Sequence, residues 1–361
     1  MSQSTLRRAN LDDPASYGAA DPGDMLSRVR ELPEQCENAW ASITSMDLRL
    51  SGGDYRNLVV LGMGGSAIGG DLARTLVAGE CSIPMLVNRD YDVPAFVDQH
   101  TLAIASSYSG NTEETLAALE CARAKGASIV TLATGGKLAE RARELDLPWV
   151  PIKYESQPRA ALGHSLILLI GVLCQAGLVS DKSRDVAEAV EVMQNLQAEL
   201  APELAVARNA AKKLAVELQG RLPVVYGAGY LSQVARRVKG QFNENSKNWS
   251  FYEILPELNH NAVLGYQYPA ELTERVVVIL LRSQLNHPRT ARRFDVTQEV
   301  LERQGVRCRS VESRGESPLA AMLSVIHFCD HVSYYLALLN GVDPTTVDAI
   351  SYLKRRLAEM G

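Results

Sequence analysis

Short runs of β-branched and other apolar residues alternate with longer helical patterns from about Leu58 onward. In the first half of the chain we predict strands at 58–61, 83–87, 102–105, 129–133 and 149–152. Strands separated by helices form right-handed βαβ units, in which helices cover both faces of a parallel sheet. The pattern therefore predicts an α/β domain.

A second series of strands follows a helical connection. Between 179 and 220 the pattern is helical and charged, and Pro202 is expected to end or kink a helix there. Strand-like runs return at Leu222 and near 276–281 and 306–310. We therefore predict two tandem, doubly wound parallel-sheet domains, divided as an N-terminal helical segment (1–40), a first domain (41–180), a helical connection (181–220) and a second domain with a C-terminal helix (221–361).

The two halves resemble each other in sequence, which suggests a duplication. Residues 57–64 and 222–229 both run from a strand into a Gly-x-Gly turn. The hydroxyl-rich turn at 106–112 has its positional counterpart at 282–289, where the clustered hydroxyls are missing. If the halves are duplicates, only the first retains a phosphate site.

Composition and charge narrow the class of protein. A chain of 361 residues exceeds the size at which one core stops growing, and 46% hydrophobic with 22% charged residues is typical of a globular protein. The 37 basic and 42 acidic residues give a formal charge of -5, which argues against a nucleic-acid partner.

The spacing of the cysteines and the length of the apolar runs indicate the cellular compartment of the protein. The six cysteines form no Cys-x-x-Cys pair, which indicates a reduced cytoplasm and no structural metal. The N-terminus lacks the apolar region of a signal peptide. The longest apolar run, 165–178, is too short to span a bilayer, so we expect a buried helix there and no membrane role.

A glycine-rich loop follows the first predicted strand. Residues 62–70 read Gly-Met-Gly-Gly-Ser-Ala-Ile-Gly-Gly and precede a helical stretch. Such a loop lets the backbone approach a ligand closely, next to the unpaired N–H groups of a helix N-terminus. A dinucleotide fingerprint fits poorly, because Ala67 stands where its third glycine would be and no acidic residue ends the next strand. The loop by itself fits a nucleotide site, a phosphosugar site or a structural turn.

A hydroxyl-rich turn follows the third predicted strand. Residues 106–115 read Ser-Ser-Tyr-Ser-Gly-Asn-Thr-Glu-Glu-Thr, so the hydroxyls of Ser107, Ser109 and Thr112 can donate to phosphate oxygens beside a helix N-terminus. Helix capping by Asn111 with Glu114 is the structural alternative. One cap needs only one polar side chain, so the cluster favours phosphate. The lysine of a nucleotide-binding P-loop is absent.

Several further motifs make a specific family resemblance. A strand ending in Gly-Gly-Ser, a later one ending in Ser-x-Ser-Gly-Asn-Thr and a third ending near 134–136 (Thr-Gly-Gly) resemble the sugar isomerase (SIS) domain, a flavodoxin-like fold. The motifs Gln-Pro-Arg-Ala-Ala-Leu-Gly at 157–163, Asn-Glu-Asn-Ser-Lys-Asn at 243–248 and Pro-Glu-Leu-Asn-His-Asn at 256–261 resemble the bifunctional phosphoglucose/phosphomannose isomerase family. The resemblance implies two SIS domains and extends from about residue 58 to 357.

The resemblance assigns residues to the substrate phosphate and its loop. It implies that the phosphate is surrounded by four hydroxyl side chains, those of Ser66, Ser107, Ser109 and Thr112. It also implies that the substrate-binding loop includes Gly64 and Gly65.

The resemblance also implies four catalytic residues. Arg159 is expected near the reacting carbons, Glu244 as the base, His260 as the group that opens the sugar ring, and Lys354 near the ring oxygen. The C-terminal run at 354–356 holds three cations, so which of them reaches the site stays open. The family is dimeric, and the resemblance suggests a homodimer in which the neighbouring subunit contributes His260.

The chemistry of aldose–ketose isomerisation requires the same residue types, without any use of the resemblance. Moving a proton between C1 and C2 needs a carboxylate with a nearby cation for the enediolate charge, roles that Glu244 and Arg159 fit. Ring opening needs a group that titrates near neutral pH, such as His260. A glutamate on a helix is otherwise usually solvated. His327 and His331 could hold a metal, but without a recognisable third ligand a packed helix face is the favoured interpretation.

The predicted activity is metal-independent interconversion of glucose 6-phosphate and/or mannose 6-phosphate with fructose 6-phosphate, through ring opening and a cis-enediol(ate), without a cofactor. One alternative is a non-catalytic sugar-phosphate sensor, which would need an output segment that the first 50 residues do not resemble. Another is amidotransfer or deamination of amino sugar phosphates, but residue 2 is serine where glutamine-dependent amidotransfer would want cysteine. Acceptance of mannose would need a further hydroxyl, for which Thr345 and Thr346 are candidates.

Overall fold

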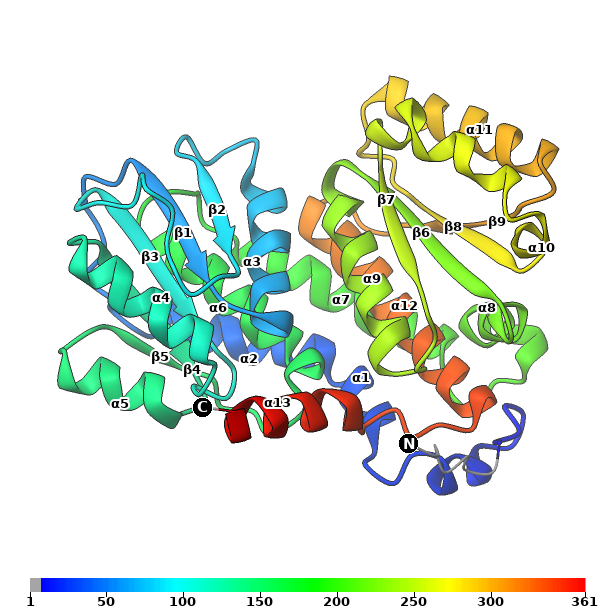
Figure 1. Cartoon of the computed structure of the whole chain (residues 1–361), viewed down its shortest axis with the longest axis horizontal. Coiled ribbons are helices and arrows are strands. Elements are labelled where there is room, and N and C mark those ends of the chain that lie inside the picture. The colour runs from blue at the N-terminus through cyan, green and yellow to red at the C-terminus, as the bar shows by residue number, and fades with distance from the viewer. Residues whose placement is uncertain (1–7, 361) are drawn as a thin grey trace.

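The computed structural model describes residues 8–360, which form two α/β halves side by side (Figure 1). Residues 1–7 of the predicted N-terminal segment 1–40, and residue 361 of the predicted second domain, lie outside the described residues. The N-terminal part contains η1 (Pro14–Ala19), α1 (Met25–Arg30) and α2 (Leu32–Thr44).

The first half contains a five-stranded parallel sheet in the order β2-β1-β3-β4-β5. Its strands are β1 (Asn57–Leu61), β2 (Met85–Asn88), β3 (Thr101–Ser106), β4 (Ser128–Ala133) and β5 (Trp149–Pro151). All five predicted strands are present, so the parallel α/β prediction is confirmed. β2 starts after the predicted residue 83, because Pro84 has no N–H to donate to the ladder.

Helices cover both faces of this sheet. One face packs against α4 (Glu113–Ala124) and α5 (Gly136–Glu144), whose Ala118, Leu119 and Leu138 share a core with alternate strand residues. The other face packs against α3 (Gly64–Val77) and α6 (Leu162–Gln175). α6 is the buried helix expected at 165–178, and it begins slightly earlier.

The second half contains a four-stranded parallel sheet in the order β7-β6-β8-β9. Its strands are β6 (Leu222–Ala228), β7 (Phe251–Leu255), β8 (Val276–Arg282) and β9 (Arg307–Glu312). Its helices are α9 (Ser232–Glu244), α10 (Ala270–Thr273), α11 (Pro288–Arg303) and α12 (Pro318–Asn340). The predicted helical connection is present as α7 (Ser183–Glu199), η3 (Val206–Arg208) and α8 (Ala210–Leu218). β7 was not expected, because this edge strand has only Leu255 buried and so lacks the apolar run of a central strand.

The strand orders of the two sheets support the duplication. In each, the second strand of the series lies beside the first, and the third and fourth follow on the other side. β1 therefore corresponds to β6, and β3 to β8. The turns at 106–112 and 282–289 follow β3 and β8, as the repeat predicts.

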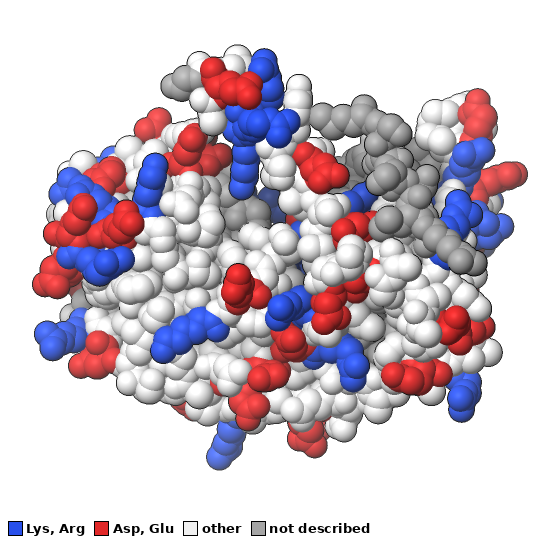
Figure 2. All heavy atoms as spheres, turned by 90° about the horizontal axis from the view of Figure 1, so that it is seen from below, with Lys and Arg blue, Asp and Glu red and all other residues white. Residues whose placement is uncertain are grey.

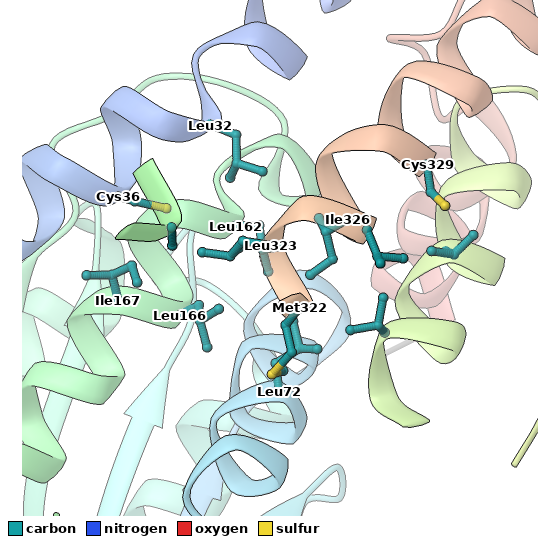
Figure 3. Close-up of a cluster of buried hydrophobic side chains, with 14 of the residues drawn as sticks. Leu32, Cys36, Leu72, Leu162, Leu166, Ile167, Met322, Leu323, Ile326 and Cys329 are labelled. Atoms are coloured by element: carbon teal, nitrogen blue, oxygen red, sulfur yellow. The ribbon is translucent and has the colours of Figure 1, made fainter. Parts of the chain in front are cut away.

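A shared core joins the halves. Apolar side chains from α2, α3, α6 and α12 meet in it, among them Leu72, Leu166, Leu323 and Ile326 (Figure 3). In α12 every residue from 319 to 338 except Phe328 is buried. Within residues 8–360, α12 is the one helix long and apolar enough to cross a membrane, but 89% of its most apolar window is buried inside the protein. The packed helix face expected at His327 and His331 belongs to this helix, but its length was not predicted, because Asp330 interrupts the apolar run.

The predicted C-terminal helix is α13 (Asp348–Met360). It runs along the underside of the molecule in the view of Figure 1. None of its side chains is buried, although Ile350, Leu353 and Leu357 are apolar. Figure 2 shows that this underside carries charges of both signs, interspersed, with uncharged areas between them.

Candidate active site

The turn after β3 is held rigidly by the loop after β4. Gly110 has φ +69°, and a Cβ there would lie 1.8 Å from the carbonyl oxygen of Gly135. The Thr134 amide donates to the Tyr108 carbonyl at 3.0 Å, and the Leu138 amide to the Gly110 carbonyl at 2.9 Å. The Thr-Gly-Gly motif at 134–136 therefore fixes the shape of the hydroxyl-rich turn.

All four predicted phosphate-binding hydroxyls make short contacts at this turn. Ser107 is buried, and its Oγ lies 2.9 Å from Oγ1 of Thr112. Ser66 reaches the turn from α3, where its Oγ accepts from the Tyr108 amide at 3.1 Å. Ser109 is exposed, and its Oγ accepts from the Asn111 amide at 3.3 Å. The structure thus brings all four residues to one turn.

The alternative of a capping box at Asn111 is wrong. The N-cap residue of α4 is Thr112, and its side chain makes no capping hydrogen bond. Asn111 instead accepts through Oδ1 from the Lys137 amide at 3.1 Å, at the start of α5. The hydroxyls of the turn are therefore not explained by capping of α4.

The glycine-rich loop contacts both the Gln-Pro-Arg motif and the hydroxyl-rich turn. Gly64 has φ +50°, which favours glycine, and begins α3. A Cβ on Gly65 would lie 2.9 Å from the carbonyl oxygen of Pro158. Only glycine at position 65 therefore lets Arg159, in η2 (Pro158–Ala160), pack against the start of α3.

A cavity of about 380 Å³ lies between α3 of the first half and α9 of the second, helices that are in contact. The predicted residues that line it are Gly64, Gly65, Arg159 and Glu244. The remaining lining residues are Ile68, Arg89, Leu162, Arg236, Arg237, Lys239, Gly240 and Tyr252.

Arg159 and Glu244 face each other in this cavity. Arg159 Nη1 lies 3.6 Å from Glu244 Oε2, and the Arg159 side chain is 4% exposed while that of Glu244 is 36% exposed. Arg159 Nε donates to Asn245 Oδ1 at 2.7 Å, and Nη2 donates to the carbonyls of Pro344 at 2.5 Å and Thr345 at 3.0 Å. Burial lowers the pKa of Arg159. The result is a fixed, buried cation beside a carboxylate that solvent and substrate can reach.

Two further cations, Lys247 and Arg237, bind the backbone segments around Arg159 and Glu244. Lys247 donates through Nζ to the carbonyls of Glu244, Asp343 and Thr346, each at 2.7 Å, and burial together with the charge of Arg159 lowers the pKa of Lys247 to about 8. The segment 343–346 is therefore tied to the end of α9.

Arg237 fixes the backbone of Arg159. Its Nη2 donates to the Arg159 carbonyl at 2.9 Å and to Asp330 Oδ2 on α12 at 3.0 Å. Both side chains are buried, and burial raises the pKa of Asp330, opposed by the Arg237 charge. The ion pair anchors the site to the shared core.

His260 and Lys354 lie away from this cavity. His260 ends η5 (Glu257–His260) and is exposed, and Lys354 is exposed on α13. Neither is among the residues, within 8–360, that line the cavity around Glu244. One chain therefore brings Arg159 and Glu244 together in a cavity that starts at the glycine loop, next to the hydroxyl-rich turn, but does not bring His260 or Lys354 there.

The two histidines of α12 are buried core residues. His331 Nδ1 lies 2.8 Å from the His327 carbonyl, and the two rings meet edge to face with centroids 4.7 Å apart. Burial lowers the pKa of both, that of His331 to about 4. In the described part of the chain no three His, Cys, Asp or Glu residues are grouped so that they could hold a metal ion.

Several residues around the cavity escaped the sequence analysis. Lys247 stands inside the motif at 243–248, so its place beside Glu244 was a signal that could have been used. Arg89, Arg237 and Asp330 carried no local signal, because their partners are distant in sequence.

Comparisons with known proteins place the chain among sugar-phosphate isomerases. Residues 207–357 match the family described as bacterial phospho-glucose isomerase C-terminal SIS domain. The chain is 41% identical over 337 residues to a bifunctional phosphoglucose/phosphomannose isomerase from Caldicellulosiruptor bescii, covering 93% of this chain and 99% of the relative. It is 36% identical to the protein of the same description from Aquifex aeolicus, covering 84% of this chain and 91% of the relative.

A solved structure shows the same fold. The tagatose-6-phosphate ketose/aldose isomerase from Escherichia coli superimposes with a TM-score of 0.68, covering 89% of this chain and 94% of that one. Its sequence identity of 17% supports similarity of fold alone.

Proposed function

The chain belongs to the bifunctional phosphoglucose/phosphomannose isomerase family, and we propose that it interconverts both glucose 6-phosphate and mannose 6-phosphate with fructose 6-phosphate. It is thus an isomerase of sugar phosphates. The observation that carries the proposal is the pairing of buried Arg159 with accessible Glu244, 3.6 Å apart, in a cavity that begins at the glycine loop beside the hydroxyl-rich turn.

In the proposed mechanism the turn holds the phosphate and Glu244 moves the proton. Hydroxyls of Ser107, Ser109 and Thr112 donate to the phosphate, which leaves the C1–C2 end of the opened sugar in the cavity. Glu244 takes the proton from one carbon and returns it to the other. Arg159, already desolvated and oriented, stabilises the enediolate oxygen as its charge develops.

We also propose that the reaction needs neither metal nor cofactor. Stabilising the enediolate is a task that a bound cation can perform in other enzymes. Here Arg159 supplies a fixed positive charge at the place where Glu244 acts.

We also propose a cytoplasmic location. The six cysteines are all unpaired, which agrees with this proposal.

An enzyme-coupled assay tests this proposal. We expect purified protein to form fructose 6-phosphate from each aldose phosphate at rates that dialysis against EDTA leaves unchanged. Binding of both sugar phosphates without turnover would instead indicate a sensor. Loss of activity that zinc restores would contradict the metal-independent mechanism.

Removing hydroxyls from the turn is expected to weaken substrate binding. We expect Ser107→Ala to raise KM for fructose 6-phosphate at least about tenfold, because one hydrogen bond to a dianion is lost and such a bond contributes about 1.5–3 kcal/mol. Steady-state kinetics measure the change.

The second half supplies a matched control for that variant. Ser283 follows β8 as Ser107 follows β3, and its Oγ accepts from the Leu285 amide at 3.2 Å. Ser283→Ala should leave KM unchanged. An equal rise in KM for both variants would contradict a phosphate site in the first turn.

We propose further that the enzyme is a homodimer in which the neighbouring copy supplies His260. Two observations support this. His260 is exposed and does not line the cavity of its own chain, and among residues 8–360 the apolar side chains of α13 are all exposed. A second copy would cover apolar surface and complete the site.

Mixing two inactive variants tests the shared site. In a heterodimer of Glu244→Gln and His260→Ala subunits, one site would carry both changes and the other neither. We expect co-refolded mixtures to regain about a quarter of wild-type activity, since about half of the dimers are mixed and each has one intact site. If His260 serves its own subunit, mixing will restore nothing.

A further inference from the structure

The cavity holds more positive charge than the proposed isomerisation of a phosphate monoester uses. Five of its lining residues are cations and one, Glu244, is an anion. Arg159 faces Glu244, and Arg237 is paired with the buried Asp330. Arg89, Arg236 and Lys239 therefore remain without a role in the reaction, and two of them, Arg89 and Arg236, share a partner.

Arg89 and Arg236 are held together by one buried carboxylate. Asp71, on α3, has a side chain that is 4% exposed, and its Oδ2 accepts from Arg236 Nη1 at 2.9 Å and from Arg89 Nη2. One carboxylate neutralises only one of two guanidiniums, so the group keeps a net positive charge. Each guanidinium has five N–H groups, and among residues 8–360 each gives only one of them, to Asp71. The remaining donors are free to bind an anion.

These arginines lie at the end of the cavity away from the reacting pair. Arg236, Gly240 and Glu244 line it at four-residue intervals along α9, so they share one face of the helix. Arg236 thus stands two turns, about 12 Å, from Glu244 along the helix axis. Gly240 leaves the surface between them free of side chains.

We propose that Arg89 and Arg236, oriented by Asp71, form a second anion-binding subsite, which takes the C1 phosphate of a sugar phosphorylated at both ends. The proposal rests on the proposed function, because that places the 6-phosphate at the turn and C1 near Glu244. A phosphate on C1 would extend from Glu244 along α9 toward these arginines, over the surface that Gly240 leaves free of a side chain. Such a bisphosphate binds as a competitive inhibitor, because its C1 oxygen is esterified and cannot become the carbonyl of an aldose.

A purely structural role for the three residues is the alternative. Asp71 and Arg89 belong to the first half and Arg236 to the second, so their ion pairs also connect the halves. A clamp of this kind would affect all ligands of the cavity alike. A subsite would affect only ligands that carry the second phosphate.

Calorimetric titration with two unreactive open-chain probes separates these roles. We expect wild-type protein to bind glucitol 1,6-bisphosphate at least about tenfold more tightly than glucitol 6-phosphate, because each charge-assisted hydrogen bond adds affinity. Arg236→Gln and Arg89→Gln should each reduce that ratio toward one. Arg236→Lys, which keeps the charge but loses the planar fork, should give an intermediate ratio.

Arg74→Gln is the matched control, because Arg74 lies on α3 near Asp71 but does not line the cavity. It should keep the wild-type ratio. A ratio near one in wild-type protein, or an equal loss of affinity for both probes in the Arg236 variants, would overturn the subsite. Failure of the proposed function would appear separately, as absence of turnover in the coupled assay.

Discussion

Glu244→Gln is expected to lower kcat for fructose 6-phosphate by at least about 10²-fold, the lower end of what a positioned base contributes. The amide keeps the shape of the side chain but cannot accept the proton, so KM should change little. The contact with Arg159 at 3.6 Å is long, so its loss should not unfold the protein. Steady-state kinetics and a thermal melt measure both effects.

His260→Ala provides the contrast to that variant. If His260 only opens the ring, His260→Ala should impair turnover of the cyclic substrate but spare exchange of the C2 proton in an open-chain analogue that cannot cyclise. Glu244→Gln should abolish that exchange. Equal loss in both variants would show that His260 shares in the proton transfer or supports the site structurally, and near-normal turnover by Glu244→Gln would exclude Glu244 as the base.

Arg159→Lys is expected to lower kcat by about 10²-fold or more, the effect of removing one preorganised donor from a developing oxyanion. Lysine keeps the positive charge but has a single ammonium group. That group cannot make all the hydrogen bonds that the planar guanidinium makes, which go to Asn245, Pro344 and Thr345, and also contact the enediolate. Stability should fall too, because a hydrogen bond to a charged group is worth about 1.5–3 kcal/mol.

The control for Arg159→Lys is Arg314→Lys, at an exposed pair with Glu199 far from the cavity lining. Exposed ion pairs contribute about 0–1 kcal/mol, so this variant should match wild type in both kcat and melting temperature. Kinetics must be run well below the melting temperature of Arg159→Lys. A folded Arg159→Lys enzyme with wild-type kcat would refute the role of Arg159 in stabilising the enediolate.

The apolar runs along the chain were enough to predict every strand of the two sheets except β7. Central parallel strands such as β1 and β3 are buried on both faces, so each appears as a continuous apolar run. The edge strand β7 has solvent along much of its length, and its residues show no such run. Burial thus explains why the central strands were predicted, whereas the little-buried edge strands differ: β2 and β9 were predicted and β7 was not.

The residues of the candidate site also fall into two groups, those that the sequence could predict and those that it could not. The hydroxyl turn, the glycine loop and the motifs around Arg159 and Glu244 are local sequences, because a tight turn or a close backbone approach constrains adjacent residues. Ion pairs such as those of Asp71 with Arg89 and Arg236 join residues far apart in sequence. A charged residue looks the same in sequence whether solvent or a distant partner neutralises it.

The sequence by itself determined the family, the two parallel α/β halves and the motifs that carry the proposed phosphate site and the proposed base. Only the tertiary structure decided that Arg159 lies buried beside Glu244, that Asp330 is a core residue paired with Arg237, and that His260 lies off the cavity of its own chain. The physical reason is the range of the interactions. Backbone geometry and apolar periodicity are properties of neighbouring residues, whereas the burial of a charge depends on which distant segments the folded chain packs around it.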